Sequence, residues 1–382
     1  MAGRSVDLVA PGPPPLDPYD PAASAWALAA ALSGHGDDVR VLHLPGSGSA
    51  SVPPGVVAVP VEIPLRRPGA PVEPAEFATA VGRRLRKPVD LILRDPAGLG
   101  ALGPSRSRGG LPVIGAFVRG VELHAFETER KGRSSPGVVG RLDTWRDRRA
   151  VRRLERTALE EADRLFYDTA AVATGLTEEY EVPARKLVAL PPAVPLLPPL
   201  PAREAARADL RIPPDVPVVL AVAAADAPEP SGVDRVLDAF RRARPFFPGA
   251  RLVLWGVASA TDPGVTSVPD RTALTLATAL AGADVAVFAR PGRAFDPGIV
   301  LAARAGVPPI VLPETTLPVD PAGGIRAAVS DDPGDLASVV AELLADPALR
   351  REIGESAARF APAFDPGRVA AALGEALAPR AA

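Results

Sequence analysis

The sequence predicts an α/β protein in which two doubly wound, Rossmann-like domains face each other across a cleft, and three observations predict it. Apolar, strand-like runs alternate with helix-like segments in both halves of the chain, which is typical of parallel sheets covered by helices. A proline-rich stretch at 191–201 interrupts this alternation, and its prolines disfavour both helices and sheet hydrogen bonds. A chain of 382 residues is long enough for two cores of ordinary size.

The first half of the chain, 1–195, has the pattern of one complete domain. Helices are expected at 21–33 and 145–162, and the second of these carries apolar residues three or four positions apart, on one helix face. The short apolar runs between them are typical of buried strands. We expect strands at 5–10, 39–44, 56–61, 91–94, 113–118, 165–167 and 187–190.

After the proline-rich stretch the pattern begins again and predicts a second domain over 196–365. Its expected strands are 216–224, 251–255, 285–288 and 309–312, and its expected helices are 233–243, 272–280 and a segment that follows Asp296. The last residues, 366–382, predict a helix that packs back on the first domain. Ligand is expected at the carboxyl ends of the strands, in the cleft between the domains.

Aspartate-proline pairs predict where helices begin. Aspartate accepts hydrogen bonds from the free amides of the first turn, and proline fits the first helical position without losing a hydrogen bond. The four pairs that we expect to begin helices start at Asp296, Asp332, Asp346 and Asp365.

Composition narrows the classes of function. The chain has no cysteine and three scattered histidines, which excludes disulfides and a thiolate nucleophile and argues against a metal site. The 43 basic and 45 acidic residues give a net charge of −2, which argues against a nucleic-acid binder. The amino terminus lacks the pattern of a signal peptide, and no apolar run reaches the ~20 residues that span a bilayer. We therefore expect a soluble, cytoplasmic protein that needs no metal or other cofactor.

Several short motifs follow one another along the chain. They are a strand motif at 162–169, a Tyr-Glu-Val-Pro passage at 180–183, a Gly-Val-Asp segment at 232–234, a Pro-Gly to Trp-Gly run at 248–256 and an Asp-Pro helix start at 346–354. Each is weak alone, but their order and spacing resemble the retaining GT-B glycosyltransferases of family 4. The resemblance implies an acceptor-side first domain and a second domain that binds a nucleotide-sugar donor.

The segment 290–310 resembles the donor-site motif of that family, with the acidic residues replaced. The family motif has a glutamate, then Gly-Phe-Gly, a second glutamate eight residues after the first, and a small-residue helix that ends in Gly-x-Pro. The residues in register with it are Phe295, Ala302, Gly306 and Pro308. At the two glutamate positions, however, the chain has Arg293 and Leu301.

Other binding positions implied by the resemblance are altered as well. Asp226 and Ser231 stand where the family has two cations that grip the donor diphosphate. Arg119 stands at the position of the family histidine, close to Glu122 on the acceptor side. The turn at 17–23 has no glycine, whereas the family uses a glycine-rich turn that lets the backbone approach the ligands.

These replacements favour a pseudo-glycosyltransferase, in which the fold is kept and ordinary sugar transfer is lost. Such a protein would serve as a binding or partner subunit, for instance of a true glycosyltransferase.

The alternative is an active but divergent glycosyltransferase. In this interpretation Arg290 and Arg293 supply the missing cations from the other side of the cleft, and Arg119 and Glu122 line the acceptor side. Asp296 argues against this alternative, because a carboxylate that caps the helix competes with a bound anion for the helix amides. A third possibility is that both arginines are solvated loop residues.

The segment 130–156 clusters ten basic residues with three acidic ones. Polybasic segments bind anionic membrane surfaces at ~1 kcal/mol per basic residue, so weak contact with such a surface is one interpretation. The other is a solvated helix face that follows a flexible loop.

Overall fold

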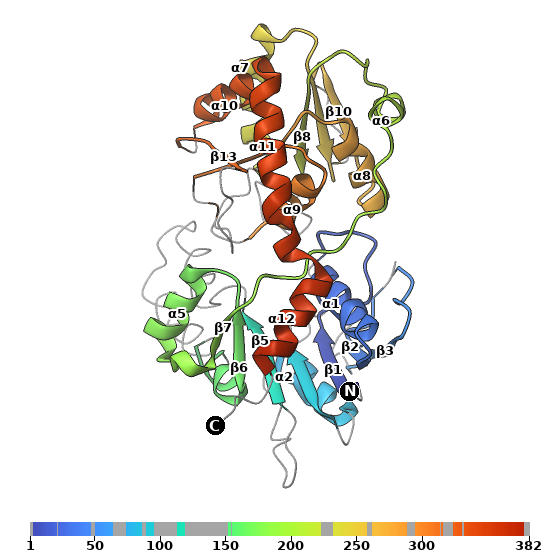
Figure 1. Ribbon diagram of the computed structural model, residues 1–382, viewed down its shortest axis with the longest axis vertical. Helices are drawn as coiled ribbons and strands as arrows, with labels where there is room; N and C mark the ends of the chain where they lie inside the picture. Colours follow the sequence, from blue (N-terminus) through green and yellow to red (C-terminus); the bar gives the residue numbers. More distant parts are fainter. Residues whose placement is uncertain are drawn as a thin grey trace, which may run out of the picture. The chain divides into compact units, whose positions relative to one another are not determined.

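The structure is a computed structural model that describes most of the chain as two compact units (Figure 1). The first unit comprises Met1–Pro15, Ser24–Ala193 and Val369–Ala382, and the second comprises Leu16–Ala23 and Val194–Arg368. The described residues are 3–20, 22–46, 50–63, 74–85, 89–94, 113–118, 152–153, 155–222, 232–257, 262–288, 295–313, 315, 324–330 and 332–377. The short segment Leu16–Ala23 thus packs with the second unit although it follows the first strand of the first.

The described residues of the first unit form a seven-stranded parallel sheet in the order β3-β2-β1-β4-β5-β6-β7. The strands are β1 (Ser5–Ala10), β2 (Asp38–His43), β3 (Val56–Pro60), β4 (Leu91–Arg94), β5 (Val113–Val118), β6 (Arg164–Tyr167) and β7 (Leu187–Ala189). The helices are α1 (Ala23–Gly34), α2 (Pro74–Arg84), α5 (Ala170–Tyr180) and α12 (Pro366–Leu377). The change of direction at β1 is the topology of doubly wound folds.

A buried ion pair lies within the first sheet. Asp7 in β1 is fully buried, and both of its carboxylate oxygens accept hydrogen bonds from Arg40 in β2, at 2.9 Å from Nε and 2.7 Å from Nη2. This bidentate geometry offsets the cost of moving the carboxylate away from water. The pair therefore serves the sheet and leaves no free carboxylate at Asp7 for chemistry.

The described residues of the second unit form a six-stranded parallel sheet in the order β10-β9-β8-β11-β12-β13. The strands are β8 (Val218–Val222), β9 (Arg251–Trp255), β10 (Val265–Val268), β11 (Val285–Phe288), β12 (Pro309–Val311) and β13 (Arg326–Ala327). The helices are α6 (Arg203–Asp209), α7 (Val233–Ala243), α8 (Ala273–Gly282), α9 (Pro297–Arg304), α10 (Pro333–Ala345) and α11 (Pro347–Phe360).

Each face of the second sheet has an apolar core of its own. Alternate residues of a strand point to opposite faces, so Val218 and Leu220 of β8 join one core while Val219 and Ala221 join the other. The first core is covered by α8, α9 and α11, and the second by α7 and α10. Burial on both faces explains why these strands are apolar at nearly every position, which is the pattern that the sequence shows.

The structure confirms the predicted α/β class and both parallel sheets. Each of the four Asp-Pro pairs named above begins a helix, and the aspartates at 296, 332, 346 and 365 accept amide hydrogen bonds from the first turn. The strand Val265–Val268 is not predicted, because an edge strand that is only half buried has no continuous apolar run. Of the predicted helix at 145–162, residues 152–153 and 155–161 are described and are helical.

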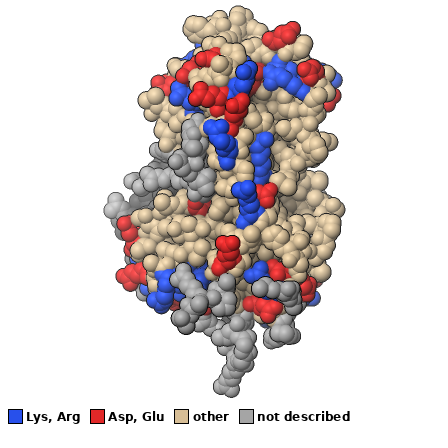
Figure 2. Space-filling model, in the orientation of Figure 1, with Lys and Arg blue, Asp and Glu red and all other residues tan. Residues whose placement is uncertain are grey.

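The face of the molecule that Figure 2 shows carries charges of both signs. Figure 2 shows basic and acidic side chains interspersed over the face that carries α11, whose exposed residues include Arg351, Arg359, Glu352 and Glu355. Every helix among the described residues is too short or too polar to cross a lipid bilayer.

Candidate functional site

The amino end of α9 is the best-defined part of the candidate site. Asp296 is its N-cap, with Oδ1 2.8 Å from the Gly298 amide, and Pro297 occupies the first helical position. Asp296 is only 5% exposed. A carboxylate thus already meets the partial positive charge of this helix end, where a bound anion would otherwise be favoured.

The body of α9 is apolar and buried. All residues from Gly298 to Ala303 are buried, and Leu301, which stands at the second glutamate position of the family motif, is fully buried. It belongs to the core that contains Trp255 of β9 and Phe288 of β11. An ionised carboxylate at position 301 would have to leave water for this apolar environment, at a cost of several kcal/mol. Position 301 is therefore a packing position in this chain.

Phe295, the other described residue of the predicted donor site, also packs. Its ring is stacked on Phe364, with the ring centroids 5.3 Å apart and the planes 3° from parallel. Phe364 is itself fully buried and meets Phe360 edge to face at 6.4 Å. Phe295 thus anchors the start of α9 to the core through aromatic contacts.

The segment Leu16–Ala23 lies against the same end of the second sheet. Asp17 Oδ2 accepts a hydrogen bond from Arg271 Nε at 2.7 Å, and Asp17 Oδ1 accepts one from the Tyr19 amide at 2.8 Å. Both side chains of the Asp17–Arg271 pair are less than one fifth exposed. The Leu16 carbonyl accepts a further hydrogen bond from the Ala273 amide. The segment is therefore tied to the second unit at both backbone and side-chain level.

Tyr19 occupies the centre of this contact. It is 8% exposed, and its ring lies 5.5 Å from that of Trp255, the last residue of β9. The Arg271 guanidinium lies over the same indole, 4.8 Å from the Trp255 ring centroid. Tyr19 and Arg271 thus share the indole at the carboxyl end of β9, the edge at which doubly wound sheets bind their ligands.

The Tyr19 hydroxyl reaches the first turn of α9. A Cβ atom added to Gly298 would overlap this hydroxyl and also the Phe288 ring, so the close approach of both aromatic side chains requires the glycine. Burial raises the pKa of the Tyr19 phenol well above its ordinary value, and the negative charges of Asp296 and Asp17 raise it further. A neutral phenol near two carboxylates offers an anion no attractive charge.

Most residues of the predicted site lie outside the described residues. Arg119 and Glu122 of the acceptor side belong to this group, and the donor-side residues in it are Asp226, Ser231, Arg290 and Arg293. Of the basic segment 130–156, only residues 152–153 and 155–156 are described. The roles expected of all these residues stay predictions.

The structure adds residues that the sequence does not single out, namely Asp17, Tyr19, Trp255 and Arg271. A signal existed in the segment 17–20, where an Asp-Pro-Tyr-Asp sequence replaces a glycine-rich turn and places an aromatic side chain in a turn. Its partner Arg271 carries no sequence signal, because the pair joins residues 254 positions apart.

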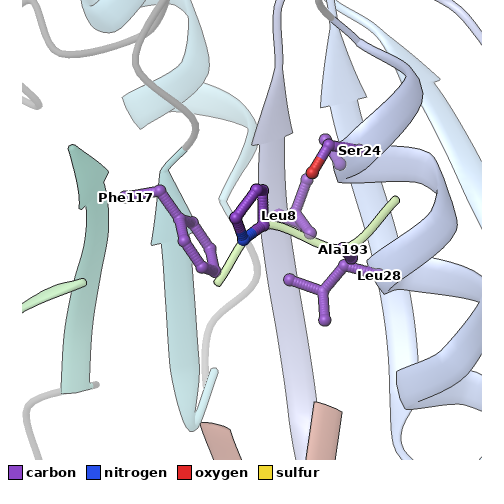
Figure 3. A pocket seen from close by; sticks show the side chains of 7 residues that line it. Leu8, Ser24, Leu28, Phe117 and Ala193 are labelled. Atoms are coloured by element: carbon purple, nitrogen blue, oxygen red, sulfur yellow. The ribbon is translucent and has the colours of Figure 1, made fainter. Parts of the chain in front are cut away.

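A small cavity in the first unit is too small to be the candidate ligand site. Its lining residues come from β1, α1, β5 and the segment after β7, and Figure 3 shows Leu8, Leu28 and Phe117 turned toward one another around it. The cavity volume is about 10 Å³, which is room for about one water molecule. Apart from Ser24, the side chains that line it are apolar.

A larger groove of about 440 Å³ lies at the opposite edge of the second sheet. Asp284 and Pro308, which line it, directly precede β11 and β12, so the groove is at the amino ends of these strands. Two of its arginines have structural partners. Arg203 donates to Asp284 at 2.6 Å, and Arg350 donates to the carbonyls of Leu343 and Leu344.

Comparisons with known proteins agree with this architecture. The family model of the glycosyl transferase 4-like domain matches residues 21–193. Sucrose-phosphate synthase from Thermosynechococcus elongatus superposes with a TM-score of 0.71 at 16% identity, over 97% of this chain and 98% of that one. The chain therefore has the GT-B fold, and its residues 21–193 match the glycosyl transferase 4-like domain.

Two further structures have the same fold over the whole length. WaaG, a glycosyltransferase involved in lipopolysaccharide biosynthesis, has a TM-score of 0.69 at 17% identity, with 98% of this chain and 100% of WaaG covered. HepE from Anabaena, solved in complex with UDP and glucose, has a TM-score of 0.70 at 14% identity, with 98% and 100% covered. No curated protein sequence matches this GT-B protein significantly.

Proposed function

We propose that this GT-B protein is a pseudo-glycosyltransferase, which has kept the glycosyltransferase fold, does not perform ordinary sugar transfer, and serves as a binding or partner subunit. The observation that carries the proposal is the amino end of α9. There a carboxylate caps the helix, a buried tyrosine covers its first turn, and leucine replaces a motif glutamate.

Electrostatics supports this proposal. A nucleotide-sugar donor brings a diphosphate, and HepE of the same fold was solved with UDP and glucose. In this chain the helix end at α9 faces Asp296, and Asp17 lies close enough to raise the pKa of the same phenol. Two like charges about 4 Å apart repel by about 4 kcal/mol at an effective dielectric constant of about 20. Asp226 and Ser231, at the positions of the two diphosphate-binding cations, add to the loss of attraction.

The alternative function is that of an active, divergent glycosyltransferase that moves a sugar from a nucleotide-sugar donor to an acceptor. The glycosyltransferases among its structural neighbours favour this interpretation. Arg290 and Arg293, which precede α9 in the sequence, would then provide the cations for the diphosphate.

Calorimetric titration with UDP, GDP and ADP separates the two functions. We expect no binding by the wild-type protein at millimolar nucleotide, and no release of sugar from UDP-glucose or other nucleotide sugars. Micromolar binding that is lost in Arg290→Ala and Arg293→Ala, but kept in Arg359→Ala, would support the enzyme instead. Arg359 is a suitable control because it is an exposed arginine of α11.

The basic segment 130–156 gives the proposal a second, weaker part, which is contact with an anionic membrane surface. Flotation with vesicles of phosphatidylserine and phosphatidylcholine tests it. We expect weak binding at low salt that disappears at physiological salt, since screening shortens the range of surface charges. No binding to anionic vesicles at low salt would exclude this contact.

A further inference from the structure

We propose that Leu16–Ala23 is an intramolecular plug, which fills the ligand edge of the second unit and keeps anions away from the amino end of α9. The inference rests on the proposed function, because it explains how the donor-binding end of this fold is kept empty. It goes further in naming the segment responsible and in making the closed state testable.

The plug has the anchors that an intramolecular ligand needs. Its carboxylate, Asp17, pairs with Arg271, and its aromatic ring, Tyr19, packs near Trp255. Ala22 is fully buried, and its amide donates to the Asp20 side chain at 2.7 Å. An anion, a ring and a buried apolar group are thus presented together by one short segment.

The contact is specific on the side of α9 as well. Gly298 leaves the space that the Tyr19 hydroxyl uses, and any side chain there would overlap it. The same Asp-Pro-Gly sequence occurs at the starts of α10, at 332–334, and α12, at 365–367, where a Cβ added to the glycine would meet the capping aspartate first. Among these helix starts, the close approach of an aromatic side chain is found at α9.

The plug is not held as tightly as it could be. The Tyr19 hydroxyl is buried beside the Asp296 carboxylate, yet no group among the described residues makes a hydrogen bond of good geometry with it. An imperfectly satisfied buried hydroxyl destabilises the closed state. An occupant that satisfies the helix end better could therefore displace the plug. Its apparent affinity would equal its affinity for the open state multiplied by the fraction of molecules that are open.

The test compares pyrophosphate binding by two full-length variants. Asp296→Asn removes the capping charge and keeps a good N-cap, because asparagine and aspartate cap helices equally well. Asp296→Asn combined with Tyr19→Ala also removes the plug ring. We expect the double variant to bind pyrophosphate at least about tenfold more tightly than the single one, because the competing ring is gone. Equal affinities would overturn the plug.

Hydrogen exchange supplies the second readout and the folding control. In the wild type we expect slow exchange for the amides of Tyr19 and Ala22 and for the first turn of α9. Tyr19→Ala should speed exchange in both places, whereas Tyr19→Phe, which keeps the ring on Trp255, should exchange at least as slowly as the wild type. Fast exchange of residues 16–23 in the wild type would overturn the proposal, because a free loop cannot be a plug.

The outcome for wild-type UDP binding distinguishes this inference from the proposed function. Binding of UDP with faster exchange at 16–23 would support a displaceable plug and contradict the pseudo-glycosyltransferase. Binding of UDP with unchanged exchange at 16–23 would contradict both. Absence of binding together with slow exchange supports both.

Discussion

The carboxyl ends and the amino ends of the strands form two edges of the second sheet, and the first is filled by side chains while the second is open. At the carboxyl ends of β9 and β11 the edge is filled by Tyr19, and the carboxylates of Asp17 and Asp296 flank it. At the amino ends of β11 and β12 lies an open groove of about 440 Å³ with arginines along it. In doubly wound folds the carboxyl edge is the usual ligand edge, so this unit has closed the usual edge and left the other one open.

If sugar transfer is lost, as proposed above, the difference explains how a ligand site can disappear while the fold is kept. Arginines of the open edge are held by carbonyls and by Asp284, so this edge supports the structure. The closed edge is filled by side chains from a distant part of the chain, and position 301, which is acidic in the family motif, belongs to the core. Substitutions at the amino edge should therefore act through the stability of the fold. Substitutions at the carboxyl edge should act through the contact with the distant segment.

The largest effect is expected at the amino edge, from Arg207→Ala. Arg207 is 2% exposed and donates to the carbonyls of Gly282 and Val216 and to Asp284. Burial lowers the pKa of its guanidinium, and the nearby charge of Arg203 lowers it further. Its loss leaves buried acceptors unpaired, so we expect the free energy of unfolding to fall by about 3–5 kcal/mol in urea denaturation.

Arg203→Ala is the matched control for Arg207→Ala, because both arginines bind Asp284. The Arg203 side chain is 44% exposed, and exposed ion pairs contribute about 0–1 kcal/mol. Equal losses for the two variants would show that the buried partners of Arg207 do not decide its contribution.

The next effect is expected at the carboxyl edge, from Gly298→Ala. The new methyl group would overlap the Tyr19 hydroxyl and, less severely, the Phe288 ring, and overpacking of this kind costs about 1–3 kcal/mol. In a Tyr19→Ala background the same substitution should cost less, because only the smaller overlap with Phe288 remains; urea denaturation of the two single variants and the double variant measures the difference. Gly367→Ala, in the same Asp-Pro-Gly context, is the control and should be near neutral. Additive losses at 298 and 19 would contradict the contact.

Alkaline pH sharpens the comparison, because a buried phenol lies at the closed edge. The pKa of Tyr19 is raised in the folded state, so its contribution to stability is present below the ordinary tyrosine pKa of about 10 and falls as pH rises above it. We expect the wild type to lose more unfolding free energy than Tyr19→Phe as the pH rises from about 9 to about 11, around that ordinary pKa. Parallel pH curves for the two proteins would mean that the phenol is not buried.

How far the sequence predicts these features depends on the range of the interactions. Apolar runs and Asp-Pro caps are local, so the first sheet, the four central strands β8, β9, β11 and β12 of the second, and the starts of α9, α10, α11 and α12 are predicted correctly. The replacement of a motif glutamate by Leu301 is also visible in the sequence, although its burial is not. The packing of Leu16–Ala23 in the second unit is not predicted, because it depends on Tyr19, Trp255 and Arg271 meeting in space.

The smallest effect is expected for the ion pair that ties the plug to the second unit. Asp17→Asn weakens a pair whose side chains are 19% and 18% exposed, so we expect a loss of about 1 kcal/mol, below that of a fully buried pair. The Asp238–Arg241 pair, with both side chains about half exposed, is the control, and Asp238→Asn should cost clearly less than Asp17→Asn because water screens an exposed pair.

Double-mutant cycles with Arg271→Ala and with Arg241→Ala isolate the coupling at the two pairs. An asparagine side chain at position 17 would still accept the hydrogen bond from the Tyr19 amide, so Asp17→Asn removes the charge and keeps the turn. A loss confined to the Asp17–Arg271 coupling would therefore show that charge, and not turn geometry, ties the segment to this edge. A loss that persists when Arg271 is already alanine would assign the effect to the turn instead.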